Sequence, residues 1–415
     1  MEPHLPDHPL NFSELLARRE AGPGLYVHVP FCARRCSYCD FSSGGISAAL
    51  AERYLAAMER EAERRAPAAR GVSFRSVFFG GGTPSALSAR HFARLWRAIS
   101  GHFAVDPRAE ITLEANPESV KPSLLEAWAE AGVNRLSMGA QSFDDEELVL
   151  LGRIHDSGKP REALALARAH GFRRLSLDLM FGFPGHRSAS WRRTIERALE
   201  LEPEHLSAYC FIPEAGTPLG DAALAGKAAL PAPEEQADLY EMLRKRVDGS
   251  GHALYETSNF ARPGGECRHN LAYWLRRDAL GLGPSAHGLW RGIREANHFG
   301  LEAWARALEE ERPFAERERE TPASRADEIV MLALRLGEGL REDDYEPPVR
   351  AETIARYGAA LAAAVAEGRI ERRPAGWRVA PAHRFVADDV IAWLAARAAP
   401  PRETAVDLTV AGAHP

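Results

Sequence analysis

Three cysteines close to the start of the chain could hold a metal. Cys32, Cys36 and Cys39 form the pattern C-x3-C-x2-C. Thiolates suit zinc, iron and iron-sulfur clusters, and three of them at this spacing could bind three irons of one cubane while the fourth iron stays open. A structural zinc site usually needs a fourth Cys or His at matched spacing, which neither His28 nor the distant Cys267 obviously supplies. The spacing therefore favours a 4Fe-4S cluster, with zinc or plain packing of the thiols as the alternatives.

The segment HNLAYW, from His269 to Trp274, could bind a flat iron-containing ligand. A neutral imidazole can ligate iron axially, and Tyr273 and Trp274 offer flat apolar faces. If the segment is helical, His269 and Tyr273 share a face. On residue types alone, a hydrogen-bonded corner of the core is the more frequent explanation. Cys267 and His287 are rival iron ligands.

Further polar and glycine residues stand where buried strand ends are expected. The run FFGGGTPS, from Phe78 to Ser85, has three consecutive glycines, which would let the backbone approach a ligand closely, although a mere turn needs no ligand. Glu114, Gln141, Arg153 and Asp178 each occupy such a position. Taken singly, each is more often a cap or a surface charge.

Six short β-rich runs alternate with helical stretches and would position these residues. The runs begin at Gly24, Ser76, Glu110, Arg135, Arg174 and His205. Helix-forming segments lie between them at 47–65, 88–100, 122–131, 145–151 and 160–170. Such βαβ units form a parallel sheet, either a barrel or an open curved sheet, with its site at the carboxyl ends of the strands. We expect the cysteines, the glycine run, Glu114, Gln141 and Asp178 to converge there.

The pattern changes after about Thr217. We expect an accessory region covering the sheet, with a helix over 234–248, and we interpret the charged, proline-containing run 312–325 as a linker. A small C-terminal domain of helices and a hairpin turning at 374–376 follows; without a basic recognition helix, a lid or docking role is favoured over DNA binding. The expected divisions are an N-terminal segment 1–23, a core 24–216, an accessory region 217–323, a mostly helical wing-like domain 324–400 and a tail 401–415.

Composition and charge exclude several classes of protein. The 415 residues are 45% hydrophobic and 27% charged, which is typical of a globular protein long enough for two domains. The net charge of -6 gives no field for nucleic acid. No export signal or membrane-spanning stretch is recognisable, so we expect a cytoplasmic protein without an integral membrane segment. The odd number of cysteines argues against a disulfide framework. A homodimer is compatible with the sequence.

The run YVHVPFCARRCSYCDF resembles the radical S-adenosylmethionine (SAM) superfamily. The resemblance implies that the open iron is chelated by the methionine moiety of SAM, and that an electron donor reduces the cluster so that an adenosyl radical forms. Tyr38, before the last cysteine, would belong to this site. By the same likeness, Gly82 and Thr83 would contact the amino group of methionine.

Within that superfamily the chain resembles coproporphyrinogen-oxidase-like proteins over nearly its whole length. This likeness implies a partial (β/α)6 TIM-type barrel of parallel strands, an α/β fold, followed by a small mostly helical C-terminal domain. Arg153 would pair with the carboxylate of SAM. Glu114, Gln141 and Asp178 would take ribose hydroxyls and neighbouring polar atoms, and Tyr26 would line the site.

Two departures separate the chain from the oxygen-independent coproporphyrinogen III oxidases. Those enzymes carry a further cysteine two residues after the third, where this chain has Phe41, and a longer segment than the 31 residues that precede Cys32. The HNLAYW segment resembles the HNxxYW signature of the related heme chaperones. We therefore expect a chaperone that binds a 4Fe-4S cluster, SAM and heme, with His269 at the heme, and delivers heme to acceptor hemoproteins, with no catalytic residues assigned. The oxidase is the alternative, and radical modification of another substrate such as tRNA is a third hypothesis.

Overall fold

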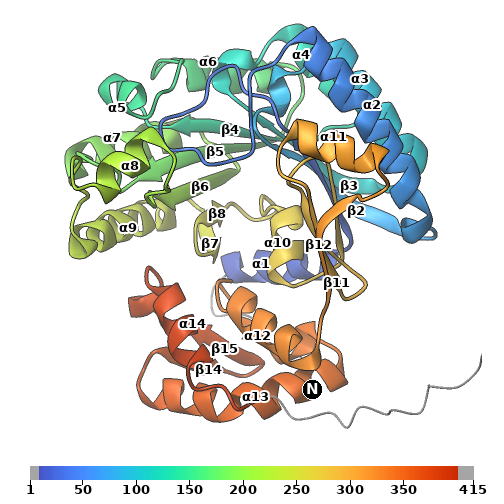
Figure 1. Cartoon of the computed structure of the whole chain (residues 1–415). Helices are drawn as coiled ribbons and strands as arrows, with labels where there is room; N and C mark the ends of the chain where they lie inside the picture. The colour runs from blue at the N-terminus through green and yellow to red at the C-terminus, as the bar shows by residue number, and fades with distance from the viewer. Residues whose placement is uncertain (1–8, 401–415) are drawn as a thin grey trace, which may run out of the picture. The chain divides into compact units, whose positions relative to one another are not determined.

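The computed structural model describes residues 9–400, which form two compact units. Within the described part, the first unit comprises 9–319 with 336–338, and the second comprises 320–335 with 339–400. The first unit holds all the residues expected to do chemistry. Figure 1 shows its curved sheet with helices outside it.

Six parallel strands build the core of the first unit and confirm the expected partial barrel. They are β1 (Gly24–Val29), β2 (Ser73–Gly81), β3 (Ala104–Ala115), β4 (Arg135–Gln141), β5 (Arg174–Phe181) and β6 (His205–Cys210), paired in chain order. The helices between them are α2 (Ala48–Arg65), α3 (Ala89–His102), α4 (Pro122–Glu130), α5 (Asp145–Leu150), α6 (Lys159–Ala169) and α7 (Ser188–Glu200). Each expected strand and helix is present, with ends shifted by a few residues.

Alternation along each strand separates a packing face from a polar face. In β1, Leu25 and Val27 are fully buried, whereas Tyr26 between them lines a cavity inside the barrel. In β2, the fully buried Val77 and Phe79 likewise flank the cavity-lining Phe78. Successive side chains of a strand point to opposite faces, so the apolar ones pack under the helices and the others enter the barrel.

The sheet continues on both sides of the core into strands that the sequence did not reveal. At one edge β9 (Ala279–Leu282) pairs parallel with β1, followed by antiparallel β10 (His287–Trp290), β11 (Ile293–Asn297) and β12 (Phe314–Arg319). At the other edge lie β8 (Asn259–Ala261) and β7 (Ala253–Glu256). The remaining helices of this unit are α1 (Pro9–Glu20), α8 (Pro218–Leu224), α9 (Pro233–Asp248), α10 (Arg268–Trp274) and α11 (Leu301–Glu309).

Residues 312–325, expected to be a linker, contain the boundary between the two units, at Arg319 and Glu320, but they are not irregular. Phe314–Arg319 is the edge strand β12, and Pro322 already begins a helix. Arg317 lies opposite Glu295 of β11, and Arg317 Nε donates to Glu295 Oε1 at 3.1 Å. Charged side chains are common on edge strands because they prevent unwanted pairing, which explains why the segment looks like a solvated linker.

The second unit is mostly helical, as expected for the C-terminal part. It contains α12 (Pro322–Ala333), β13 (Leu340–Arg341), α13 (Pro347–Ala366), β14 (Ile370–Arg373), β15 (Gly376–Val379) and α14 (Ala387–Ala395). The expected hairpin is present as the antiparallel pair β14 and β15. Its own apolar core includes Ile329, Leu361 and Val390. Among the described residues of the chain, no helix has the length and apolar character needed to cross a bilayer.

Candidate functional site

One cavity of about 520 Å³ inside the barrel is lined by all the residues expected to bind the cluster or SAM, and by His269. They are Tyr26, Cys32, Cys36, Tyr38, Cys39, Gly82, Thr83, Glu114, Gln141, Arg153, Asp178 and His269. Its size is that of a site for a small-molecule ligand. The expectation that residues at the carboxyl ends of the strands meet at one place is therefore met by the geometry.

Backbone contacts hold the cysteine loop over the end of β1. The Cys32 N–H donates to the Gly44 carbonyl oxygen at 2.8 Å, and the Ser37 N–H donates to the Leu151 carbonyl oxygen at 3.2 Å. Ser37 Oγ donates to the Leu150 carbonyl oxygen at 2.8 Å, and the Leu219 N–H donates to the Ser37 carbonyl oxygen at 2.8 Å. The loop is thus fastened to the segment after α5 and to the start of α8.

Polar side chains from two other segments contact the thiols. Thr83 follows β2, whereas Arg153, expected at a strand end, lies just after α5. Cys32 Sγ lies 3.3 Å from Thr83 Oγ1, and Arg153 Nη1 donates to Cys36 Sγ at 3.3 Å. Burial, together with the nearby thiols, raises the pKa of Cys39 to about 11. The free thiol is therefore protonated at neutral pH, and a metal would have to displace its proton.

Asn116 is a contributor that the sequence analysis missed. Arg153 Nη2 donates to Asn116 Oδ1 at 2.7 Å and to the Gly139 carbonyl oxygen at 2.8 Å, which fixes the guanidinium beside the cysteine loop. Arg153 Nε is buried and has no hydrogen-bond partner among residues 9–400. Asn116 comes two residues after Glu114 and directly before a proline, and this position is the sequence feature that could have identified it as a site residue.

Two carboxyl groups in the cavity have raised pKa values. Burial, with the nearby charge of Asp178, raises the pKa of Glu114 to about 8. Burial also raises the pKa of Asp178, although Ser137 Oγ donates to Asp178 Oδ1 at 3.0 Å. Gln141 is a non-glycine residue in the left-handed region, with φ of 64°. Such strain tends to persist where the surroundings require it, often at binding sites.

His269 sits among aromatic rings on the side of the cavity towards the amino ends of β1 and β2. Its ring stacks on Phe78, with centroids 5.1 Å apart, and meets Tyr273 edge-on at 4.9 Å. Nδ1 hydrogen-bonds to Ser76 Oγ at 2.9 Å, whereas the buried Nε2 has no partner within the described chain. Burial lowers the pKa of His269 to about 4, so the imidazole is neutral, as an iron ligand must be.

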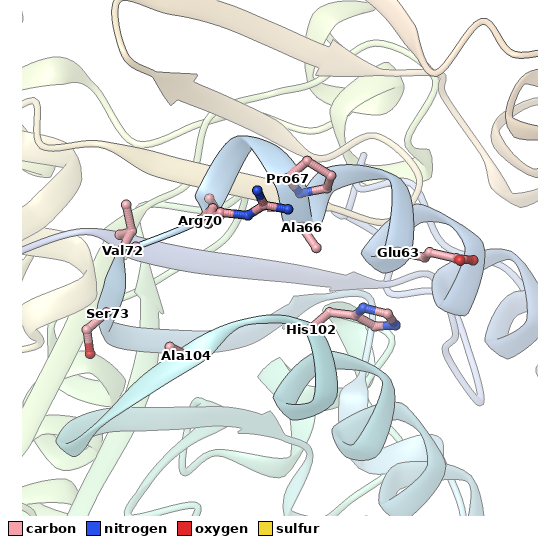
Figure 2. A pocket seen from close by; sticks show the side chains of 10 residues that line it. Glu63, Ala66, Pro67, Arg70, Val72, Ser73, His102 and Ala104 are labelled. Atoms are coloured by element: carbon pink, nitrogen blue, oxygen red, sulfur yellow. The ribbon is translucent and has the colours of Figure 1, made fainter.

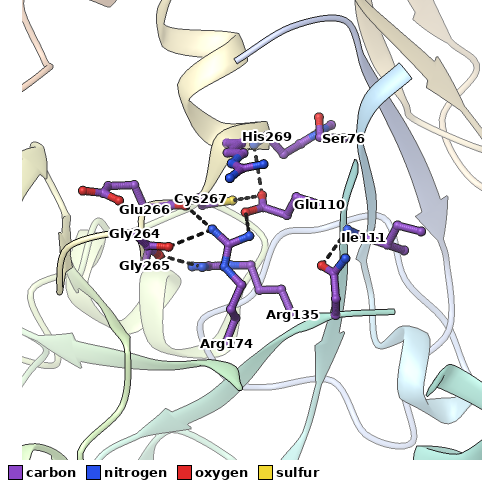
Figure 3. Close-up of polar contacts among 12 residues, drawn as sticks. Ser76, Glu110, Ile111, Arg135, Arg174, Gly264, Gly265, Glu266, Cys267 and His269 are labelled. Atoms are coloured by element: carbon purple, nitrogen blue, oxygen red, sulfur yellow. Dashed lines mark hydrogen bonds and ion pairs between the residues drawn. The ribbon is translucent and has the colours of Figure 1, made fainter. Parts of the chain in front are cut away.

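A buried ionic cluster anchors the segment that leads into α10, as Figure 3 shows. Glu110 Oε1 accepts a hydrogen bond from the His269 N–H at 3.2 Å, and Glu110 Oε2 lies 3.3 Å from Arg174 Nη1. Arg174 Nη2 donates to the Gly264 carbonyl oxygen at 2.9 Å, and Arg135 Nη1 donates to that of Gly265 at 2.7 Å. These residues were also missed, because their strand positions give no sign of the distant segment that they hold.

The two aromatic residues of HNLAYW and the two rival iron ligands, Cys267 and His287, lie in different places. Tyr273 lines the cavity, but the expectation that Trp274 offers a face there was wrong: Trp274 packs against the apolar cluster that contains Ala17 and Leu275. Cys267 lines the cavity, yet burial and Glu110 raise the pKa of its thiol to about 12. His287 is exposed and does not line the cavity.

No group of three His, Cys, Asp or Glu side chains among residues 9–400 is arranged to hold a single metal ion.

A second hollow, of about 490 Å³, lies outside the barrel near the amino end of β2. Figure 2 shows Glu63, Arg70 and His102 around it. None of the residues expected to bind a cofactor lies there, and we assign it no role.

The neutral His269 makes stability depend on pH. Its folded pKa of about 4 lies below the ordinary value of 6.5, so the unfolded chain binds the proton more tightly and stability falls as pH falls below 6.5. Between pH 7 and 5 this amounts to about 2 kcal/mol. In urea titrations at the two pH values, we expect the wild type to lose about 2 kcal/mol more unfolding free energy between pH 7 and 5 than His269→Phe, which keeps a ring in the stack. An equal loss of unfolding free energy in the two proteins would contradict the buried, neutral imidazole.

Comparison with known proteins agrees with this geometry. The family model for the radical SAM superfamily matches residues 26–198. A heme chaperone HemW of Mycobacterium tuberculosis is 37% identical over 328 residues, covering 76% of this chain and 82% of that protein. A heme chaperone HemW of Bacillus subtilis is 34% identical over 324 residues, covering 77% and 85%.

Among solved structures, coproporphyrinogen III oxidase (HemN) from Escherichia coli, a radical SAM enzyme, is similar with a TM-score of 0.77. The identity is 25%, and 92% of each chain is covered. The likeness of sequence to the HemW proteins is higher and extends over most of their length. The chain therefore belongs to the HemW family of the radical SAM superfamily.

Proposed function

We propose that this protein is a heme chaperone that binds a 4Fe-4S cluster, SAM and heme and passes heme to acceptor hemoproteins. The observation that supports it is the meeting of Cys32, Cys36, Cys39 and a buried His269 with an unpartnered Nε2 in one cavity. The delivery role follows from the names of the relatives, which are heme chaperones. The division into a core at 24–216 and an accessory region at 217–323 remains part of this proposal.

The cavity residues fit a cluster with SAM. The three half-buried thiols would hold the cluster, which supplies one-electron chemistry when it has been reduced by an electron donor. Arg153, with an unpartnered Nε beside Cys36, suits the carboxylate of SAM, and Thr83 with the backbone of Gly82 suits its amino group. Glu114, Gln141 and Asp178, which line the same cavity, would take ribose hydroxyls and neighbouring polar atoms, and Tyr26 and Tyr38 would line the site.

Heme, as the cargo, would be ligated by Nε2 of His269. The hydrogen bond from Nδ1 to Ser76 fixes the ring orientation, in the way that other metal-ligating histidines are held. His269 is only 1% exposed, so iron could reach Nε2 only if α10 moved away from the barrel. Such a movement would break the hydrogen bond from the His269 N–H to Glu110 and would expose Leu271 and Ala272, which are buried in an apolar cluster.

Loss of the three thiols is expected to abolish cluster binding. We predict that a Cys32→Ser, Cys36→Ser, Cys39→Ser variant, reconstituted anaerobically, falls from about four irons per chain to near zero, because serine hydroxyls are poor ligands of iron. Iron and sulfide analysis measures this. Cys210→Ser is the matched control, since Cys210 does not line the cavity. Unchanged iron in the triple variant, or stoichiometric zinc in the wild type, would refute the cluster.

Removal of the imidazole is expected to weaken heme binding. We predict that His269→Ala raises the Kd for heme by at least about tenfold, which is about 1.4 kcal/mol, and changes the heme absorption spectrum. Titration of cluster-reconstituted protein with heme measures both. The exposed His287, replaced by alanine, is the control. If His269→Ala keeps the affinity and spectrum of the wild type, His269 is not the ligand.

The structural likeness to coproporphyrinogen III oxidase keeps an enzymatic function as the second candidate. Phe41 stands where those enzymes have a further cysteine, and its side chain is exposed at the cavity rim. We expect no conversion of coproporphyrinogen III to protoporphyrinogen in an anaerobic assay with SAM and reductant. Product formation at enzymatic rates would overturn the chaperone proposal in favour of the oxidase.

A further inference from the structure

Asn116 holds two other side chains of the cavity through the two ends of its amide. It follows β3, precedes the short 3-10 turn Pro117–Ser119, is half-buried and lines the cavity. Its Oδ1 accepts a hydrogen bond from Arg153 Nη2 at 2.7 Å, and its Nδ2 donates a weaker one to Thr83 Oγ1 at 3.5 Å. Because Arg153 follows α5 and Thr83 follows β2, one amide joins three separate segments of the barrel.

Only one orientation of the Asn116 amide fits these partners. A guanidinium has no acceptor, so the atom that faces Arg153 must be the carbonyl oxygen. The NH2 group then faces Thr83, whose hydroxyl oxygen accepts and keeps its own hydrogen for another acceptor. Cys32 Sγ, 3.3 Å from Thr83 Oγ1, is the contact that remains for that hydrogen.

The side chain of Asn116 is not used to form the local turn. An asparagine directly before a helical turn commonly accepts hydrogen bonds from the N–H groups of that turn. Among the described residues 117–119 no such bond to its side chain forms. Instead, the Asn116 N–H donates to Ser85 Oγ at 3.2 Å, and Ser119 Oγ donates to the Asn116 carbonyl oxygen at 2.6 Å. The two serines hold the backbone, which leaves the amide for the cavity.

Both partners of the amide also contact the cysteine loop. Arg153 Nη1 donates to Cys36 Sγ at 3.3 Å, and Thr83 contacts Cys32. Hydrogen bonds to the sulfur ligands are one of the features that set the potential of an iron-sulfur cluster, because they stabilise the added negative charge of its reduced form. A residue that aligns both donors therefore acts on two of the three thiols.

We propose that Asn116 is a positioning residue that aligns Arg153 and Thr83 both on the cluster thiols and on the methionine end of SAM. The inference rests on the proposed function, which assigns the cluster to the cysteines and the carboxylate and amino group of SAM to these two side chains. Asn116 acts through them and need not touch either ligand. Its amide occupies Nη2 of Arg153 and leaves Nε, unpartnered within residues 9–400, for the carboxylate.

SAM and decarboxylated SAM, which lacks only the carboxylate, test the alignment of Arg153. Each is titrated into cluster-reconstituted wild type, Asn116→Leu and Asn116→Asp. We expect the wild type to prefer SAM, and both variants to reduce that preference by about tenfold or more, as the loss of a well-aligned charge-assisted hydrogen bond would. Leucine leaves the guanidinium unsupported, whereas a carboxylate at this position would pair with it and compete with the ligand.

The reduction potential of the cluster, measured without SAM, tests the alignment of both donors on the thiols. We expect both variants to disfavour reduction by about tenfold, which for one electron is a shift of about 59 mV to more negative potential. In Asn116→Asp, the Thr83 hydroxyl would donate to the new carboxylate rather than to Cys32. This variant is nearly isosteric, so it still tests the inference if Asn116→Leu fails to fold.

Asn134→Leu is the matched control. Asn134 also fastens β3 with both ends of its amide, since Oδ1 accepts from the Ile111 N–H at 3.0 Å and Nδ2 donates to the Ala109 carbonyl oxygen at 2.8 Å. It does not line the cavity. Its replacement should lower stability without moving the SAM preference or the potential.

The outcomes separate this inference from the proposed function. An unchanged SAM preference or an unchanged potential in both Asn116 variants would overturn the positioning role, and so would an equal shift in Asn134→Leu. A wild type that binds neither a cluster nor SAM would overturn the proposed function itself.

Discussion

The buried carboxylate of Glu110 holds the first turn of the helix that carries His269. Burial raises its pKa, but Arg135, Arg174 and the backbone N–H groups of His269 and Arg268 outweigh that effect and lower it overall. Removing one partner of such a buried set typically costs about 3–5 kcal/mol, since the remaining charges lose their compensation. Because α10 has only seven residues, tertiary contacts of this kind, rather than its own helix propensity, must hold it in place.

The carboxyl groups nearer the cysteine loop have raised pKa values, in contrast to Glu110. Glu114 lacks a cation at hydrogen-bonding distance within the described chain, and burial raises its pKa to about 8, so at neutral pH it is mostly protonated. A protonated carboxyl can donate as well as accept, which suits hydroxyl groups. A cationic sulfonium nearby would favour the ionised form. The cavity thus contains carboxyl groups whose charge depends on the ligand.

Periodicity and local motifs predicted the six core strands, all the helices between them except α7, and many of the residues that line the cavity. They could do so because parallel strands bring their carboxyl ends together whatever the loops do. The strands β7 to β12 are short or charged, and their pairing depends on partners far along the chain. The expectation that Trp274 faces the cavity was wrong for a related reason. Its position in a seven-residue helix does not indicate which part of the protein its side chain packs against. Glu110, Arg135 and Arg174 carried no local signal, since ionisable residues at the start of a strand usually look like surface charges.

The glycine run at the end of β2 is required by packing even when no ligand is bound. Gly81 has φ of 105°, and a Cβ there would lie 2.5 Å from the His28 ring. A Cβ on Gly82 would lie 2.7 Å from the carbonyl oxygen of Phe31, the residue before Cys32. The Thr83 N–H donates to that same oxygen at 2.6 Å. Any side chain at Gly82 would therefore push the cysteine loop away from β2, so the glycines that expose backbone to the cavity also set the position of the first thiol.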